Sequence, residues 1–202
     1  MRHLSADVER IERSSLGPAR FRDAPYVVML SGLPGVGKST VCRELCRRLG
    51  AAVVESDAVR WALFPRPTFD AQESAYVFQV VHSVMARMLR RGVPVIMDAT
   101  NVLERHREAV YEIAEGCGAP LHVLRIAAPA KVVKRRLESR GAARGGHDYP
   151  VARWDIYRRM RESAEPIGRD HHLIDTSGDY DAALERFVET IENATTRLER
   201  KR

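Results

Sequence analysis

The sequence predicts an α/β protein: a three-layer α/β/α sandwich around a mainly parallel five-stranded sheet, with a helical lid. Short apolar segments alternate with longer amphipathic segments along most of the chain. Such alternation is typical of parallel sheets, because parallel strands are joined by helices. In addition, a glycine-rich segment lies between the first strand and the next helix, a junction that often binds phosphate in such folds.

Five segments predict strands because they are short, apolar and partly β-branched. In chain order they are residues 26–30, 51–55, 93–97, 121–127 and 172–175. The segments between them repeat apolar residues at helical spacing, which predicts helices. One helix runs from the glycine-rich segment to about residue 49, and the others span about 69–91, 103–115, 130–140, 150–163 and 180–199.

The length of 202 residues predicts one main domain with a good core. We expect this domain at residues 25–202, with the lid at about 130–163. Residues 1–24 are polar and lack a clear apolar period, so we expect a partly disordered extension. A short helix could form there from Leu4, Val8 and Ile11, ended by Leu16-Gly17-Pro18.

The composition, with 45% apolar and 30% charged residues, is typical of a soluble globular protein. No apolar run reaches about 18 residues, and the amino terminus lacks the apolar core of a signal peptide. We therefore expect a cytoplasmic protein with no membrane partner. Cys42 and Cys46 lie four residues apart on a predicted helix, which fits small core residues better than a metal site.

The formal net charge of +6 is concentrated in one segment. Residues 131–161 hold ten Lys or Arg and three acidic residues, a net charge of +7, which leaves the rest of the chain near −1. A local excess of this kind favours an anionic ligand nearby.

The segment Gly32-Leu33-Pro34-Gly35-Val36-Gly37-Lys38-Ser39 fits G-x-x-x-x-G-K-[ST], the phosphate-binding loop. Glycines let the backbone approach an anion, and N–H groups at the start of the next helix then face phosphate oxygens. Lysine in this motif reaches the β- and γ-phosphates, and the serine hydroxyl binds Mg²⁺. The predicted ATP-binding residues are Gly32, Gly35, Val36, Gly37, Lys38, Ser39 and Thr40.

Asp57 and Arg60 follow the second strand at its carboxyl end, where open parallel sheets bind ligands. Their spacing on a first helical turn predicts that both side chains face the same side. A carboxylate there could accept the proton of an attacking hydroxyl, and the arginine could hold an anionic acceptor. Taken alone, the pair also fits a helix cap with a surface ion pair.

Asp98 ends the third strand. Its position predicts that it supports Mg²⁺ together with Ser39. A strand-ending Asx turn is the alternative. Asn101 could orient Asp98 or the acceptor.

Arg136 and Arg140 lie four residues apart on the basic helix, so one face carries both. A basic helix, a glycine-rich link and a second helix predict a lid that brings arginines over the phosphates. A solvated basic face is the alternative.

These residues resemble the P-loop kinases, a family that includes phage and bacterial polynucleotide 5′-kinases. The resemblance covers about residues 25–165 and rests on Gly32–Thr40, Asp57–Arg60, Asp98–Asn101 and Lys134–Arg140. It implies the sheet order 2-3-1-4-5. Adenylylsulfate kinases, gluconate kinases, antibiotic phosphotransferases and zeta-type toxins look similar in the loop and lid.

The resemblance also implies roles for individual residues. Lys38 and Ser39 would bind ATP and Mg²⁺, and Asp57 would be the general base. Arg60 would contact a phosphate of the acceptor strand, and Asp98 would belong to the active site. Arg140 or Arg136 would contact the ATP phosphates.

The predicted function is therefore ATP-dependent transfer of the γ-phosphoryl group to a hydroxyl. The leading acceptor is the 5′-hydroxyl of DNA, RNA or a nucleotide. The alternative is a small-molecule kinase that acts on a sugar, nucleoside or antibiotic. The second alternative is a non-catalytic nucleotide-binding module. No N-K-x-D motif occurs, which argues against a GTPase switch.

Overall fold

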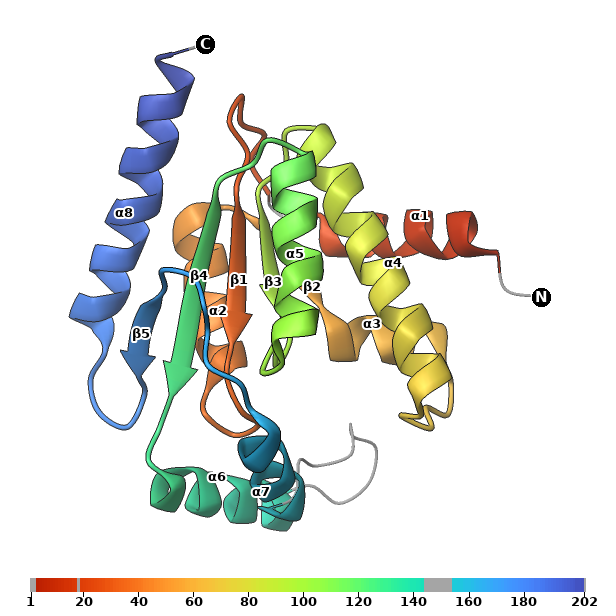
Figure 1. Ribbon diagram of the computed structural model, residues 1–202, viewed down its shortest axis with the longest axis vertical. Coiled ribbons are helices and arrows are strands. Elements are labelled where there is room, and N and C mark those ends of the chain that lie inside the picture. Colours follow the sequence, from red (N-terminus) through yellow and green to blue (C-terminus); the bar gives the residue numbers. More distant parts are fainter. Residues whose placement is uncertain (1–2, 18, 144–153, 202) are drawn as a thin grey trace.

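The computed structural model describes residues 3–17, 19–143 and 154–201, with side chains omitted at 140–143. Its sheet has five strands in the order β2-β3-β1-β4-β5 (Figure 1). All neighbouring strands pair in parallel. The strands are β1 (Val27–Ser31), β2 (Ala52–Glu55), β3 (Val95–Asp98), β4 (Leu121–Ala127) and β5 (His172–Asp175). The predicted fold class and sheet order are thus confirmed.

Helices join the core on both faces of the sheet (Figure 1). One face packs against α1 (Leu4–Ser15), α3 (Ser56–Leu63), α4 (Ala71–Arg90) and α5 (Glu104–Gly116). The other packs against α2 (Lys38–Leu49), α6 (Ala130–Ala143), α7 (Trp154–Ser163) and α8 (Asp181–Glu199).

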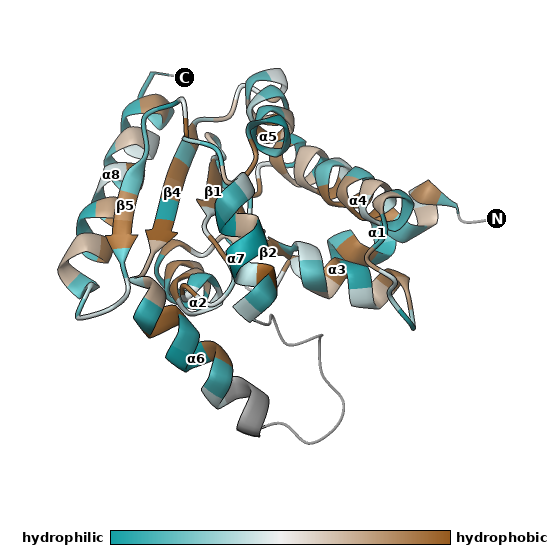
Figure 2. Ribbon diagram, turned by 60° about the horizontal axis from the view of Figure 1, so that its bottom comes forward, coloured by the Kyte–Doolittle hydropathy of each residue, from teal (hydrophilic) through white to brown (hydrophobic). Residues whose placement is uncertain are grey.

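The central strand β1 shows why the sheet needs helices on both faces. Val27 and Met29 belong to the core on the α4 side, whereas Val28 and Leu30 belong to the core on the α2 side. All four are fully buried, as expected for a parallel strand covered on both faces. Figure 2 shows the apolar strands in brown between helices that carry hydrophilic residues on their outer sides.

The amino-terminal segment differs from the partly disordered extension that we expected. Residues 4–15 form α1, and its residues Val8 and Ile11 are buried in the core beside α4. On the same helix, the buried carboxylate of Glu12 pairs with Arg87 at 2.8 Å and Arg91 at 2.6 Å. The short helix that we considered for Leu4, Val8 and Ile11 is therefore present. Its apolar stripe and its acids match the surface of α4, which lies far along the chain.

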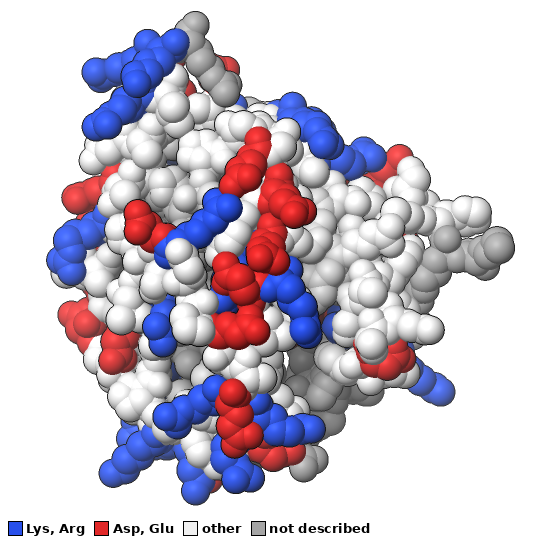
Figure 3. All heavy atoms as spheres, in the orientation of Figure 1, with Lys and Arg blue, Asp and Glu red and all other residues white. Residues whose placement is uncertain are grey.

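The lid segment is described in part. Helices α6 and α7 are present, and residues 144–153 between them lie outside the described residues. Figure 3 shows Lys and Arg side chains gathered over α6 and α7, while acidic side chains line up near α5. Within the described ranges, none of the helices has the length and apolar character needed to cross a membrane.

Two half-buried histidines predict a loss of stability in acid. Burial, followed by the charge of a neighbouring histidine, lowers the pKa of His82 and the pKa of His122 to about 4. The Nε2 atoms of both rings are buried without a hydrogen-bond partner in the described structure. An unfolded histidine takes up its proton near pH 6.5, whereas these two folded rings stay neutral down to about pH 4. Protonation of the unfolded chain therefore lowers the free energy of unfolding as pH falls from about 6.5 to 4.

We expect each histidine to account for about 1–2 kcal/mol of the stability lost between pH 7 and pH 5. The measurement is the free energy of unfolding in urea at both pH values. His82→Gln and His122→Gln should each lower the difference, and the exposed control His171→Gln should not. An unchanged difference in the first two variants would contradict the assignment.

Candidate functional site

The loop between β1 and α2 has the backbone geometry of an anion site. Gly35 and Gly37 have φ values of 81° and 101°, which residues with a side chain rarely adopt. Gly37 precedes α2, and no side chain caps that helix. The first N–H groups of α2 therefore have no side-chain acceptor and are suited to phosphate oxygens.

The other predicted loop residues lie around this backbone. The N–H of Gly32 donates to the carbonyl of Thr100 at 2.9 Å, which ties the loop to the end of β3. Val36 is buried, whereas Thr40 and Ser39 are exposed. A Cβ atom on Gly35 would lie 2.9 Å from Val133 of α6, so α6 packs directly on the loop.

Lys38, Ser39 and Asp98 come together at the carboxyl ends of β1 and β3. The Nζ atom of Lys38 donates to the carbonyl of Leu33 at 3.1 Å, so it folds back over the loop. Asp98 is 5% exposed. Burial raises the pKa of the Asp98 carboxyl, and the charge of Lys38 and a hydrogen bond from Ser39 partly offset this effect. The three residues predicted for phosphate and Mg²⁺ are therefore neighbours.

Glu55 is a site residue that our reading of the sequence missed. It ends β2 and pairs in register with Asp98 at the end of β3. Burial raises the pKa of Glu55, the charges of Asp98 and Asp57 raise it further, and Lys38 lowers it. The sequence could have predicted Glu55 as a site residue, because it ends a predicted strand and the carboxyl ends of neighbouring parallel strands meet at one edge of the sheet. Three carboxylates thus influence one another beside one ammonium group.

These carboxylates do not form a complete metal cage. Across the described residues, no group of three His, Cys, Asp or Glu side chains is placed to hold a metal ion. Mg²⁺ commonly binds through one or two carboxylates, water and substrate phosphates instead. Ser39 and Asp98 therefore fit a magnesium ion that arrives with a nucleotide.

Asp57 and Arg60 lie one turn apart on α3 (Ser56–Leu63) but differ in exposure and in partners. Asp57 is exposed at the start of α3 and close enough to affect the pKa of Asp98. Arg60 is 6% exposed and pairs with the buried carboxylate of Glu73 in α4. Its guanidinium also lies 4.6 Å from the ring centre of Phe69 and donates to Ser74 at 3.2 Å. Arg60 therefore has a neutralising partner on α4, and its predicted contact with an acceptor stays a prediction.

The Arg60–Glu73 pair predicts a large effect on stability. Glu73 also accepts the N–H groups of Thr68 at 2.7 Å and Phe69 at 3.1 Å. Removal of a partner from a buried ion pair leaves an uncompensated charge, so Glu73→Ala should lower the free energy of unfolding by about 3–5 kcal/mol. Urea denaturation measures it. The control Glu44→Ala, in an exposed pair with Arg47, should change little; equal losses in both variants would contradict the prediction.

Of the two predicted lid arginines, only the side chain of Arg136 is described. Its Nη1 donates to Thr176 Oγ1 at 2.9 Å and to the carbonyl of Val36 at 3.3 Å, and its Nη2 donates to the carbonyl of Thr176. Arg136 therefore joins α6 to the phosphate loop and to the segment after β5. The side chain of Arg140 lies outside the described part, so the role of Arg140 stays a prediction.

Asn101 supports the loop from behind. It has φ 46°, a conformation that asparagine adopts more readily than most residues. Its Nδ2 donates to the carbonyl of Leu30 at 2.8 Å, and its own carbonyl accepts Ser31 Oγ and Arg107 Nη1, each at 3.0 Å. These bonds fix the end of β1, so Asn101 positions the backbone from which the phosphate loop starts.

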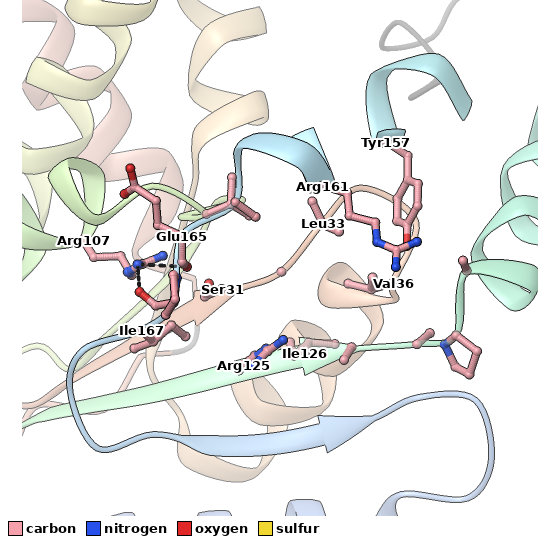
Figure 4. A pocket seen from close by; sticks show the side chains of 18 residues that line it. Ser31, Leu33, Val36, Arg107, Arg125, Ile126, Tyr157, Arg161, Glu165 and Ile167 are labelled. Atoms are coloured by element: carbon pink, nitrogen blue, oxygen red, sulfur yellow. Dashed lines mark hydrogen bonds between the residues drawn. The ribbon is translucent and has the colours of Figure 1, made fainter. Parts of the chain in front are cut away.

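A cavity of about 540 Å³ lies beside the loop, under α7 (Figure 4). Gly32, Leu33 and Val36 form part of its wall, whereas Lys38, Asp57 and Asp98 do not line it. The cavity and the cluster of charged residues are therefore two neighbouring parts of the loop region.

A phosphate-binding loop behind the central strand of a parallel sheet in the order β2-β3-β1-β4-β5 defines the P-loop kinase fold. The chain belongs to the AAA domain family, whose model matches residues 27–167.

Among curated proteins, the chain is similar to the adenylyl-sulfate kinase of Myxococcus xanthus (strain DK1622), with 29% identity over 119 residues. This match covers 57% of the chain and 64% of the relative, so the chain spans less than two thirds of that protein.

Similar solved structures include a gluconokinase from Sinorhizobium meliloti 1021 and the APS kinase CysC of Mycobacterium tuberculosis in complex with AMPPNP and APS. The first has a TM-score of 0.59 and 18% identity, and the match covers 89% of this chain and 99% of that one. The second has a TM-score of 0.58 and 20% identity, with coverage of 84% and 98%. At these identities the likeness concerns the fold.

Proposed function

We propose that this protein is a cytoplasmic ATP-dependent kinase that phosphorylates a hydroxyl group of a small molecule. The observation that carries the proposal is the meeting of Lys38, Ser39 and Asp98 beside the carboxylates of Glu55 and Asp57. A phosphate loop alone fits a binding module, whereas carboxylates beside its lysine fit transfer to a hydroxyl. Two similar proteins, an adenylyl-sulfate kinase and a gluconokinase, are also named for small-molecule acceptors.

Different residues of this chain have different roles in phosphoryl transfer. Bound ATP supplies the phosphoryl group. The N–H groups at the start of α2 and the ammonium of Lys38 hold its phosphates, and Ser39 with Asp98 supports magnesium. Asp57, whose carboxylate is exposed, accepts the proton of the acceptor hydroxyl. Helices α6 and α7 act as the lid, within a catalytic domain at residues 25–202.

The structure also bears on the choice of acceptor. Arg60, Arg66 and the basic segment were our reasons to expect a nucleic acid. Arg60 is neutralised by Glu73, and Arg136 is held by Thr176 and Val36. The guanidinium groups of Arg60 and Arg136 are therefore engaged within the protein, whereas Arg66 is exposed. The similar kinases give the nucleic-acid acceptor no support. The excess of Lys and Arg over α6 and α7 fits a nucleotide equally well.

An acceptor screen tests the proposal. ADP formation is followed with γ-labelled ATP and Mg²⁺ against sugars, sugar acids, nucleosides, adenosine 5′-phosphosulfate and aminoglycosides, with 5′-hydroxyl DNA and RNA oligonucleotides beside them. We expect label on a small molecule. Label on the oligonucleotides alone would restore the nucleic-acid acceptor, and ATP binding without transfer to any acceptor would support the non-catalytic module.

A further inference from the structure

The cavity under α7 combines apolar walls with two cationic side chains (Figure 4). Its apolar wall comes from the phosphate loop, β4 and the segments that follow β3, β4 and α7. The main residues are Leu33, Val36, Val102, Ile126, Pro129 and Ile167. A volume of about 540 Å³ lies in the usual range for small-molecule sites.

Arg125 is unusual because it lies within β4, between β1 and β5 in the sheet. It pairs in register with Ser31, the last residue before the phosphate loop. Its neighbours two residues away on the same face are Val123 and Ala127, so a charge interrupts an apolar series. Arg125 is exposed, and its side chain has no hydrogen-bond or ion-pair partner within residues 3–17, 19–143 and 154–201.

Arg161 supplies the second cation from the opposite side. Figure 4 shows it beside Tyr157 on α7, directed toward the phosphate loop, while Arg125 lies along β4. Arg161 likewise has no partner in the described part of the chain. The Tyr157 ring stacks on Trp154 with 4.8 Å between the ring centres, which holds this wall in place.

The remaining charged groups of the cavity have partners already. Arg107 is fully buried and pairs with Glu104, and it also donates to the carbonyls of Asn101 and Pro166. The carboxylate of Glu165 accepts the N–H of Glu104. The charges left for a ligand are therefore those of Arg125 and Arg161.

We propose that this cavity binds the anionic end of the phosphoryl acceptor, a small molecule that carries a carboxylate, sulfate or phosphate held by Arg125 and Arg161. The proposal rests on the proposed function. The apolar body of the molecule lies between Tyr157 and Ile167. Because Leu33 lines the cavity and its carbonyl accepts the Lys38 ammonium, the ligand lies against the segment that positions this lysine.

The test compares three anions with matched uncharged molecules by titration calorimetry. The pairs are gluconate with sorbitol, glycerol 3-phosphate with glycerol, and adenosine 5′-phosphosulfate with adenosine. Saturating Mg·ADP fills the phosphate loop, so that the anions cannot bind there. At least one anion should bind more tightly than its counterpart. Arg125→Gln and Arg161→Gln should each weaken that anion by about tenfold or more, since each removes charge-assisted hydrogen bonds.

The control is Arg158→Gln, an exposed arginine on α7 that does not line the cavity. It should leave anion binding unchanged, and all three variants should bind Mg·ADP like the wild type. Thermal denaturation shows whether each variant is folded, and Arg161→Gln serves as the surface variant if Arg125→Gln unfolds. Failure of all three anions to bind, or equal binding in wild type and variants, would overturn the proposal. Anion binding that persists without phosphoryl transfer to any acceptor would overturn the proposed function alone.

Discussion

Replacement of Lys38 with methionine is expected to lower kcat/KM for phosphoryl transfer by about 10³–10⁵-fold, or about 4–7 kcal/mol. In the proposed function, Lys38 is the cation that holds the transferring phosphate. Its Nζ bonds to the loop at Leu33. Burial raises the pKa of Asp98 and of Glu55, and the charge of Lys38 partly offsets this rise. Methionine keeps most of the length of the side chain but removes the charge. Preorganised charges of this kind are among the largest contributions to catalysis.

The measurement is the steady-state rate of ADP formation at saturating acceptor, after thermal denaturation has shown that the variant is folded. Lys201→Met removes the same charge beyond the end of α8 and is the matched control. It should retain the wild-type rate. A Lys38→Met variant with near-normal kcat/KM would mean that the loop holds phosphate without taking part in transfer, and the kinase proposal would then lose its main support.

Local sequence patterns were sufficient for the fold and for the phosphate loop. The strand before Gly32, the helix behind Lys38 and the acidic end of β3 each depend on residues close in sequence. The sheet order came from the family resemblance, and the pairing of β1 with β3 and β4 agrees with it. Glu55 was also within reach, because it ends a predicted strand beside Asp98.

Pairings between distant segments were not accessible in this way. Arg60 looked free because its partner Glu73 lies 13 residues away, on a helix whose direction the sequence does not give. In the same way, Arg136 is bound to Thr176, which lies 40 residues further along the chain. The sequence did not predict a role for Arg125, because one arginine in an apolar strand belongs to no motif. Its role depends on which element covers that face of the sheet.

Asp57 and Glu55 are the two carboxylates that could accept the proton of the hydroxyl, and their environments differ. Asp57 is exposed at the start of α3, whereas Glu55 is partly buried at the end of β2. Burial and the charges of Asp98 and Asp57 raise the pKa of Glu55, which favours its protonated form compared with an ordinary glutamate. We therefore expect Asp57→Asn to lower kcat by about 10²–10⁴-fold, the usual contribution of a general base.

Glu55→Gln should have a smaller effect on kcat, because this substitution removes a charge beside Asp98 but leaves the exposed carboxylate of Asp57 in place. Both variants are measured with the acceptor that the screen identifies, and the KM for ATP is determined in each. The KM for ATP should stay near the wild-type value in both variants, because neither substitution removes a group that we assign to the ATP phosphates. If Glu55→Gln causes the larger loss of kcat, then Glu55 accepts the proton and Asp57 acts on it through charge alone.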